Sequence, residues 1–454
     1  MMQEGLKILF VSLGCDKNLV DTEEMLGILS DKGYTFTDDE NEADIAVVNT
    51  CSFIKDAQKE SIEALLELGE LRTQGKLKAL IAAGCLAQRY QEEILKEIPE
   101  VDAVIGTSAQ EEIALALEEV LEKEDPERLR IRSLRNKPTT GARRILTTGG
   151  WYGYLKIADG CNKGCSYCAI PSFRGPFRSV PEEELLAQAR DLAAQGVREL
   201  ILVAQETTLY GVDLYGEKRL PALLKKLCEI EGIEWIRILY AYPEEITDDL
   251  IRVIKEEPKI VHYLDMPIQH ASDGILEKMR RRTNRQELEE IVTRIRTQIP
   301  DMCLRTTLIT GFPGETEKDH QELLSFVKKM KFDRLGVFTY SREEGTPAAR
   351  MSYQVPALVK RKRQKDLMLA QQKIAFSQAR KMKGKVLTAM VEGKIADEDV
   401  YTARTYRDAP GVDGLLFIET KKELMTGDLV EVRVIGSQDY DLIGKPAGPS
   451  RDQN

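Results

Sequence analysis

The sequence predicts an α/β protein in three parts: an N-terminal open parallel α/β domain, a central partial (β/α) barrel, and a small C-terminal all-β barrel. Two observations predict this class. Continuous apolar, strand-like runs alternate with helical patterns over residues 1–125 and again over residues 151–355, which is typical of parallel sheets crossed by helices. From residue 385 onward, short strand patterns are separated by turn residues, which predicts an all-β module.

Length, composition and charge limit the possible functions. The 454 residues are 42% hydrophobic and 31% charged, as in a soluble globular protein with several domains. No run of about eighteen apolar residues occurs, and the N-terminus lacks the basic head and apolar core of a signal peptide. We therefore expect a cytoplasmic protein without a membrane span. The net charge of −10 argues against a chain that mainly grips a phosphate backbone.

The N-terminal α/β domain is expected over residues 1–125. Strands are predicted at Lys7–Leu13, Ala43–Asn49, Leu77–Ala83 and Val101–Ile105, with helices at Asn18–Lys32 and Asp56–Leu71. Because these strands are apolar without alternation, we expect them to be buried on both faces. Residues 126–150 carry Pro, Gly, Thr and many Arg, which predicts a linker or surface excursion.

The central barrel is expected over residues 151–355. Its six predicted strands are Tyr152–Asp159, Glu199–Ala204, Trp235–Tyr240, Tyr263–Met266, Cys303–Ile309 and Leu335–Tyr340. Helical patterns fill the gaps between them. Six such units fit a partial (β/α) barrel, and in such folds the chemistry lies at the C-terminal ends of the strands.

The last two segments differ in charge. Residues 356–384 predict a basic helical connector, and Lys360–Lys385 contains ten Lys or Arg and one Asp, a net charge of +9. Two interpretations stay open: a solvated helix face, or a surface that contacts RNA. The β module over residues 385–446 is acidic, with eight Lys or Arg against twelve Asp or Glu. An acidic module suits a basic protein partner better than RNA.

The first cysteine group follows the first strand of the barrel. Eight cysteines and only three histidines mean that any metal site in a reducing cytosol is mostly thiolate. Cys161, Cys165 and Cys168 lie in GCNKGCSYC, a C-x3-C-x2-C spacing. Three thiolates on one loop can hold an iron–sulfur cubane and leave one iron open for a cofactor or substrate. The alternative is a zinc knuckle or structural cluster, which would need a fourth ligand nearby; no Cys or His follows before Cys228.

This spacing resembles the signature of the radical S-adenosylmethionine (SAM) superfamily, and Tyr167 before the last cysteine also matches. The resemblance implies a [4Fe–4S] cluster whose open iron chelates SAM, and a 5′-deoxyadenosyl radical made by one-electron cleavage of SAM. The segment LITGFPGET at residues 308–316 is similar to a turn that lies beside SAM in that family. Polar residues at two strand ends would alone be ordinary, but together with this turn they are the expected contacts of SAM or substrate. The expected contacts are Gln205, Glu206, Thr207, Gln269, Gly311, Pro313, Gly314 and Glu315.

The second cysteine group lies in the N-terminal domain. Cys15, Cys51 and Cys85 follow the apolar segments FVSLG, AVVNT and LIAAG. All three should emerge at the C-terminal edge of one sheet, where open α/β sheets bind ligands. They form a plausible site for a second cubane; the alternative is three buried structural cysteines. Cys228, in an amphipathic helix, and Cys303, in a buried strand, are assigned to packing.

The whole chain resembles the methylthiotransferase family: an α/β domain with three such cysteines, a radical SAM barrel, and a C-terminal module that resembles a TRAM domain. The resemblance implies insertion of a methylthio group into an unactivated C–H bond, an electron donor, and two [4Fe–4S] clusters that face one cavity. The implied ligands are Cys15, Cys51 and Cys85 for the sulfur donor, and Cys161, Cys165 and Cys168 for the radical generator.

Local sequences favour one branch of this family. The family divides mainly into enzymes that modify tRNA adenosine and a branch that modifies an aspartate of the small-subunit ribosomal protein numbered twelve. The segment SLGCDKNLVDTE and the ending EVRVIGSQDYDLIG resemble the ribosomal-protein branch, and the acidic module agrees with it. We therefore predict transfer to the β-carbon of that aspartate. A tRNA enzyme, which the basic connector favours, and a non-enzymatic iron–sulfur scaffold or electron carrier are the alternatives. Residues 280–282, three arginines, are candidates for gripping the substrate carboxylate or form a solvated helix end.

Overall fold

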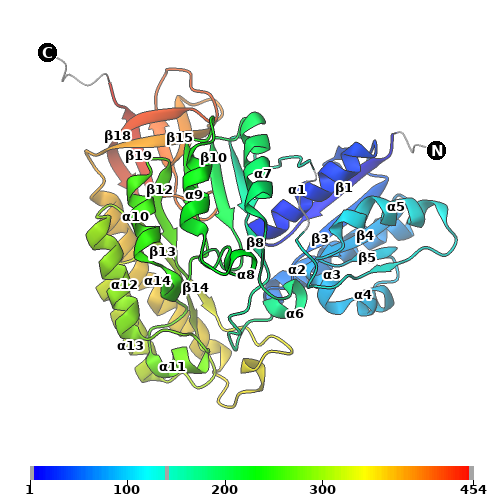
Figure 1. Cartoon of the computed structure of the whole chain (residues 1–454), viewed down its shortest axis with the longest axis horizontal. Coiled ribbons are helices and arrows are strands. Elements are labelled where there is room, and N and C mark those ends of the chain that lie inside the picture. Colours follow the sequence, from blue (N-terminus) through cyan, green and yellow to red (C-terminus); the bar gives the residue numbers. More distant parts are fainter. Residues whose placement is uncertain (1–4, 139–142, 449–454) are drawn as a thin grey trace.

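The computed structural model describes residues 5–138 and 143–448, and it confirms the predicted fold class. Figure 1 shows the N-terminal domain in blue and cyan on one side of the central barrel, with the C-terminal β module in red at the far end of the barrel. Residues 139–142, which belong to the predicted linker, lie outside the described residues. Within the described ranges, no helix combines the length and the apolarity that crossing a membrane requires.

The N-terminal domain is a six-stranded parallel sheet in the order β2-β1-β3-β4-β5-β6. The strands are β1 (Lys7–Ser12), β2 (Thr35–Thr37), β3 (Ile45–Thr50), β4 (Ala79–Gly84), β5 (Ala103–Ile105) and β6 (Leu129–Arg130). Helices α1 (Asp16–Asp31) and α5 (Ile113–Glu122) cover one face; α2 (Lys55–Thr73), α3 (Cys85–Tyr90) and α4 (Glu92–Glu97) cover the other. A 3₁₀ turn, η1 (Gln110–Glu112), precedes α5. Every residue of β3 and β4 is buried, which explains their unbroken apolar sequences.

The expected linker, residues 126–150, is partly built into the N-terminal domain. Its β6 extends the sheet, and Arg130 on this strand is 1% exposed and pairs with Glu119 at 2.6 Å. Farther along, Arg144 is buried against Glu23 of α1. These anchors are ion pairs rather than apolar contacts. Because arginines are typical of exposed segments, the composition of residues 126–150 predicted a linker or surface excursion.

The central domain is an open barrel of six parallel strands in the order β14-β13-β12-β11-β10-β7. The strands are β7 (Tyr152–Lys156), β10 (Glu199–Val203), β11 (Trp235–Ile238), β12 (Ile260–Asp265), β13 (Cys303–Thr310) and β14 (Arg334–Thr339). Two short strands, β8 (Ala158–Asp159) and β9 (Arg178–Ser179), form a separate antiparallel pair. The remaining elements are α6 (Ile170–Arg174), α7 (Glu182–Ala194), α8 (Val212–Tyr215), α9 (Leu220–Cys228), η2 (Pro243–Glu245), α10 (Asp248–Glu256), α11 (Asp273–Lys278), α12 (Arg285–Gln298), α13 (Glu317–Met330) and η3 (Ala348–Arg350).

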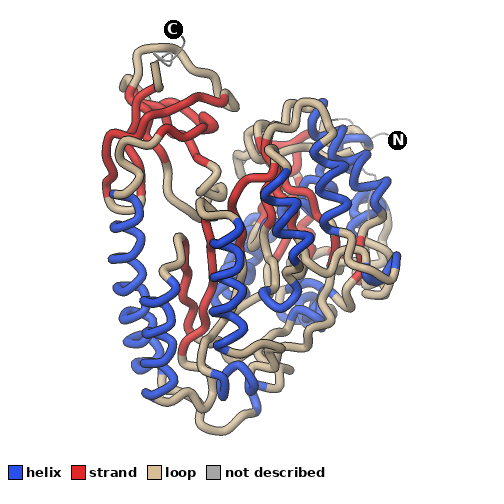
Figure 2. The backbone as a smooth tube through the Cα atoms, turned by 60° about the vertical axis from the view of Figure 1, so that its left-hand side comes forward, coloured by secondary structure: helices blue, strands red, loops and turns tan. Residues whose placement is uncertain are grey.

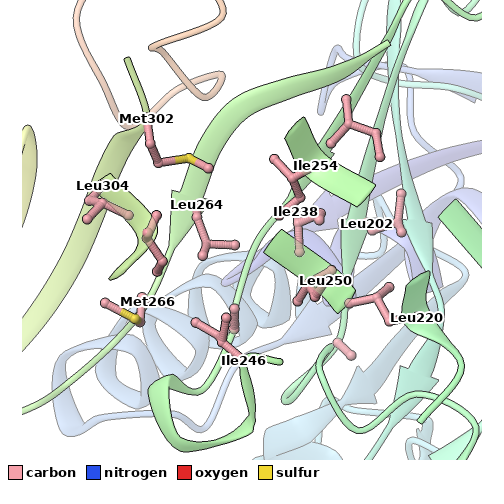
Figure 3. Packing of buried hydrophobic residues seen from close by; sticks show 14 of the residues in the cluster. Leu202, Leu220, Ile238, Ile246, Leu250, Ile254, Leu264, Met266, Met302 and Leu304 are labelled. Carbon is pink, nitrogen blue, oxygen red and sulfur yellow. The ribbon is translucent and has the colours of Figure 1, made fainter. Parts of the chain in front are cut away.

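The outer face of this sheet packs against helices in the largest hydrophobic core of the molecule. Figure 3 shows Ile238 of β11 and Leu264 of β12 beside Leu250 and Ile254 of α10. This layer leaves the inner face of the barrel free for other parts of the chain.

The C-terminal module is a closed barrel of β15 (Val386–Lys394), β16 (Val400–Thr405), β17 (Leu416–Glu419), β18 (Leu429–Gln438) and β19 (Asp441–Pro446). It lies at the end of the molecule that carries the C-terminus (Figure 2). A buried ion pair attaches it to the inner face of the central barrel: Glu199 of β10, which also pairs with Arg237 of β11 at 2.7 Å, pairs with Arg404 of β16 at 2.8 Å. Polar contacts therefore fix the module against the central domain.

Helix α14 (Ala357–Arg380) is the expected basic connector, and it covers β14, the edge strand of the barrel sheet. Gln364, Gln371 and Gln378 donate to the main-chain carbonyls of Val337, Phe332 and Lys331 at 2.7, 2.8 and 2.9 Å. An edge strand has unpaired backbone groups. Gln364 satisfies one of them in β14, and the other two amides bond carbonyls of the segment just before the strand. One side of α14 is therefore packed against the barrel, whereas its other side is exposed, and both interpretations of that basic face stay open.

Candidate metal centres and cofactor site

The N-terminal cysteines stand where neighbouring strands of one sheet end. Cys51 and Cys85 directly follow β3 and β4, and Cys15 lies three residues after β1. Since β1, β3 and β4 are adjacent in the sheet, their loops leave it side by side. This is the edge at which open α/β sheets bind ligands.

Two glycines let these loops approach each other closely. Gly14 has a φ of +97°, and a Cβ built on it would lie 2.8 Å from the Sγ of Cys51. Gly84 has a φ of +92°, and a Cβ there would lie 2.2 Å from Oδ1 of Asn49. Only a residue without a side chain suits both the backbone conformation and the space. The loops are thus shaped to bring the thiols close to one another.

The environment of these thiols fits a metal–sulfur group. Burial raises the pKa of Cys51, and it raises the pKa of Cys85 to about 12, with the charges of the neighbouring cysteines adding to both effects. Such thiols lose their protons when a metal takes the proton's place. In the described part of the chain, no three Cys, His, Asp or Glu side chains converge as the ligands of a single ion would. A cubane has a different requirement, because each thiolate binds a different iron and the thiols stand around the cluster.

The second trio lies on the loop between β8 and α6. The backbone N–H of Ser166 donates to Met279 O at 3.0 Å and fixes the loop to the segment after α11, and Cys168 N–H donates to Cys165 O at 3.1 Å and closes a turn within the loop. Burial raises the pKa of Cys161 to about 11 and that of Cys168 to about 12. These thiols therefore have the same dependence on a bound metal as the N-terminal trio.

Two of the predicted SAM contacts at the end of β10 keep an acceptor oxygen that makes no hydrogen bond in the described structure. Gln205 donates to Asp159 at 3.1 Å, while its Oε1 is buried and has no hydrogen-bond partner in the described structure. Glu206 is fully buried, which raises its pKa to about 7, and its Oε2 has no hydrogen-bond partner there but lies 3.7 Å from Nζ of Lys163. Thr207 instead donates to the carbonyl of Leu239 at 2.8 Å. Gln205 and Glu206 are therefore the members of this group with capacity for a ligand.

The predicted turn after β13 is held from within. The Glu315 carboxylate accepts the backbone N–H groups of Gly311 at 2.5 Å and Phe312 at 3.1 Å, and it pairs with Arg363 of α14 at 3.0 Å. Glu315 thus shapes the turn that also contains Pro313 and Gly314. Gln269 lies alongside, with its backbone N–H bonded to Thr307 O at 2.9 Å and its own φ at +71°.

Sequence reasoning missed the side chains that join the two cysteine sites. Arg174 of α6 donates from Nε to the Sγ of Cys85 at 3.3 Å. Lys17, two residues after Cys15, places its Nζ 3.3 Å from the centre of the Tyr240 ring at the end of β11. These contacts set the cysteine edge of the N-terminal sheet against the C-terminal strand ends of the barrel. Buried cations of this kind give no pattern in the sequence that distinguishes them from surface charges.

The three arginines at residues 280–282 do not share a site. Arg281 is buried, with its guanidinium 4.2 Å from the centre of the Tyr242 ring. Arg282 lines an open groove of about 910 Å³ along α12, and no cysteine lines that groove. Arg280 is exposed. The three arginines therefore differ in environment, and their assignment as candidates for the substrate carboxylate stays a prediction.

The remaining two cysteines match their assignment to packing. Cys303 is fully buried in β13, and its thiol donates to the carbonyl of Arg407 at 3.3 Å. Cys228, at the end of α9, is partly buried against the core of the central domain. Neither takes part in a cysteine trio.

Three family models match successive parts of the chain: Uncharacterized protein family UPF0004 over residues 7–106, Radical SAM superfamily over residues 155–327, and TRAM domain over residues 384–446. Among solved structures, TsrM from Kitasatospora setae, a radical SAM methyltransferase, superposes with a TM-score of 0.56 at 14% identity, covering 76% of this chain and 77% of that one. The cobalamin-dependent SAM radical enzyme OxsB superposes with a TM-score of 0.52 at 12% identity, covering 81% and 56%. At these identities the likeness concerns the fold alone.

Curated relatives are similar over nearly their full length. The ribosomal protein uS12 methylthiotransferase RimO of Lachnoclostridium phytofermentans is 58% identical over 439 residues, covering 97% of this chain and 99% of that protein. The protein of the same name from Geobacter sulfurreducens is 50% identical, covering 97% and 98%. That from Thermoanaerobacter sp. is 47% identical, covering 96% and 98%. With its paired cysteine sites and these relatives, the chain belongs to the RimO family of radical SAM methylthiotransferases.

Proposed function

We propose that this protein transfers a methylthio group to the β-carbon of an aspartate in ribosomal protein uS12, with SAM and two [4Fe–4S] clusters as cofactors. The observation that carries the proposal is the placement of two cysteine trios on opposite sides of one domain interface, joined by Arg174. The relatives named for this activity support the choice of substrate. Since uS12 is a ribosomal protein, the proposed place of action is the cytoplasm.

We assign the two trios different tasks. Cys15, Cys51 and Cys85 would hold the cluster that presents the sulfur, and Cys161, Cys165 and Cys168 would hold the cluster that binds SAM. When bound, these groups supply the one-electron chemistry and the sulfur that an unactivated C–H bond requires. The cluster next to SAM would receive its electron from a separate donor protein.

The chain itself would bind and orient SAM. Gln205 and Glu206 lie directly after β10 and each has a buried oxygen without a hydrogen bond in the described structure, where amino and hydroxyl groups of SAM would find acceptors; the Glu206 oxygen also faces Lys163 at 3.7 Å. Positive φ angles at Gly311 and Gly314 favour glycine in this turn, where a Cβ would meet the side chains of Lys360 and Lys278. Glu315 and Arg363 hold that turn in place.

The substrate side of the proposal concerns charge. The acidic C-terminal module would meet the basic surface of a ribosomal protein. Exposed basic side chains follow α14 along its outer side and continue into the turn after it: Arg361, Lys362, Lys365, Lys373 and Arg380 in the helix, and Lys383 in the turn. We propose that these residues contact phosphates of ribosomal RNA near the substrate. If so, modification of uS12 within small subunits would fall more steeply with salt than modification of free uS12, which lacks the RNA phosphates.

The test uses anaerobically reconstituted protein with SAM, a chemical reductant and either purified uS12 or tRNA. Mass spectrometry is expected to find one methylthio group on an aspartate of uS12, and 5′-deoxyadenosine is expected to form. A methylthio group on tRNA alone would replace the proposal with the tRNA enzyme. Absence of 5′-deoxyadenosine would favour a scaffold or electron carrier.

A further inference from the structure

Arg174 is a buried cation that lies between the two cysteine sites. It ends the five-residue helix α6, directly after the loop of the second trio, and it is 2% exposed. Its Nε donates to the Sγ of Cys85 at 3.3 Å, and its Nη1 lies 2.7 Å from the carboxylate of Asp21. Its Nη2 donates to the Oδ1 of Asn18. The guanidinium thus connects a barrel element to α1 and to a proposed cluster ligand.

The partner of Nε is informative. Carboxylate and amide oxygens occupy the other nitrogens of this guanidinium, whereas Nε faces sulfur. A neutral thiol is a weak acceptor, and a fully buried charge needs strong partners. A thiolate bound to iron carries negative charge and makes a charge-assisted hydrogen bond. The geometry around Arg174 therefore suits the metal-bound state of Cys85.

The same residue reaches the SAM side. Nη1 of Arg174 lies 3.4 Å from the carboxylate of Asp159, which comes two residues before Cys161. Asp159 in turn accepts from Gln205 at 3.1 Å. A continuous set of contacts therefore runs from Cys85 through Arg174 and Asp159 to Gln205.

We propose that Arg174 is a positioning residue for the sulfur-donating cluster: it holds the Cys85 thiolate, raises the reduction potential of that cluster, and fixes the cluster relative to the SAM site. A nearby cation and an N–H···S hydrogen bond both stabilise the reduced cluster, which has one more negative charge. The inference rests on the proposed role of Cys85 as a cluster ligand.

The experiment measures the potential of this cluster in the full chain. Cys161, Cys165 and Cys168 are changed to Ala, so that only the N-terminal cluster contributes to the electron paramagnetic resonance signal during a redox titration. Arg174→Met, which removes charge and donors, is expected to lower the potential. Arg174→Lys, which keeps the charge without the fork of donors, is expected to lower it less.

Arg178→Gln is the matched control. Arg178 lies in the same segment, lies 3.8 Å from Asp159 and donates to the carbonyl of Arg174, but its polar contacts do not include a cysteine. Its removal is expected to leave the potential of the cluster unchanged. In protein with both clusters, Arg174→Met is also expected to lower methylthio transfer by about 10–100-fold while 5′-deoxyadenosine still forms.

The reference is the protein in which only Cys161, Cys165 and Cys168 are changed to Ala. If both Arg174 variants have the same cluster potential as this reference, the inference is overturned. If Arg174→Met does not fold, the same result in Arg174→Lys alone overturns it. Failure of the proposed function is a separate outcome, because it appears as the absence of methylthio product from the unmutated protein and does not affect the titration.

Discussion

Replacement of Glu199 by Gln is expected to destabilise the attachment of the C-terminal module to the central barrel. Glu199 is fully buried and binds two guanidiniums, Arg237 at 2.7 Å and Arg404 at 2.8 Å. Hydrogen bonds to charged groups contribute about 1.5–3 kcal/mol each. Loss of one partner from a buried ion pair costs about 3–5 kcal/mol, because the remaining charge stays buried. We take about 3–5 kcal/mol as the expected loss in free energy of unfolding.

The assay is thermal unfolding of the reconstituted protein at one heating rate. For a domain of the size of the central barrel, a loss of 1 kcal/mol lowers the Tm by about 2–4 °C. A loss of about 3–5 kcal/mol in Glu199→Gln should therefore lower the Tm by about 6–20 °C. Glu234→Gln is the control, since Glu234 is 44% exposed and lies 3.8 Å from Arg198. Its expected effect is below about 0.5 kcal/mol. Equal Tm values for Glu199→Gln and the unmutated protein would refute the reasoning.

The same pair predicts a pH dependence. Burial alone would raise the pKa of Glu199, but Arg237 and Arg404 outweigh it and lower the pKa below its ordinary 4.5. A carboxylate with a lowered pKa adds stability above its unfolded pKa and loses it as the pH falls through the folded pKa. The Tm difference between Glu199→Gln and the unmutated protein should therefore be complete at neutral pH and should shrink below about pH 4.5.

Two further variants test the cofactor sites. Gly14→Ala places a Cβ against the sulfur of Cys51, a proposed ligand, and should lose about four irons per chain. Gly33→Ala is the control, because Gly33 has a similar positive φ but open space beside it, and this variant should keep its iron. Equal iron contents in the two variants would contradict the assignment of a cluster to the N-terminal cysteines. Arg363→Met leaves the Glu315 carboxylate without its cation and should weaken SAM binding about tenfold in calorimetry. Lys362→Met, at the exposed neighbouring position, is the control and should leave the affinity for SAM unchanged. If Arg363→Met also binds SAM as tightly as the unmutated protein, the turn does not depend on α14.

The sequence was sufficient for the features that local patterns encode. Unbroken apolar strands placed Cys51 and Cys85 at neighbouring strand ends, and a compact C-x3-C-x2-C spacing marked the second trio. Both features depend on residues that lie close together in the chain or on the regular geometry of a parallel sheet.

Other features depend on contacts between distant segments. Gln371 of α14 bonds the main chain before β14, and Arg174 bonds Cys85 across two domains. Polar residues in such positions look like surface residues in the sequence, because their partners become visible only when the chain is folded. The anchoring of residues 126–150 by Arg130 escaped prediction for the same reason.

The most direct test of the central claim is the iron content of three proteins purified without oxygen. We expect about eight irons in the unmutated chain, and about four when either Cys15, Cys51 and Cys85 or Cys161, Cys165 and Cys168 are all changed to Ala. Only the first of these variants should still cleave SAM to 5′-deoxyadenosine. About four irons in the unmutated chain, or SAM cleavage that survives loss of the second trio, would contradict the assignment of two clusters to these cysteines.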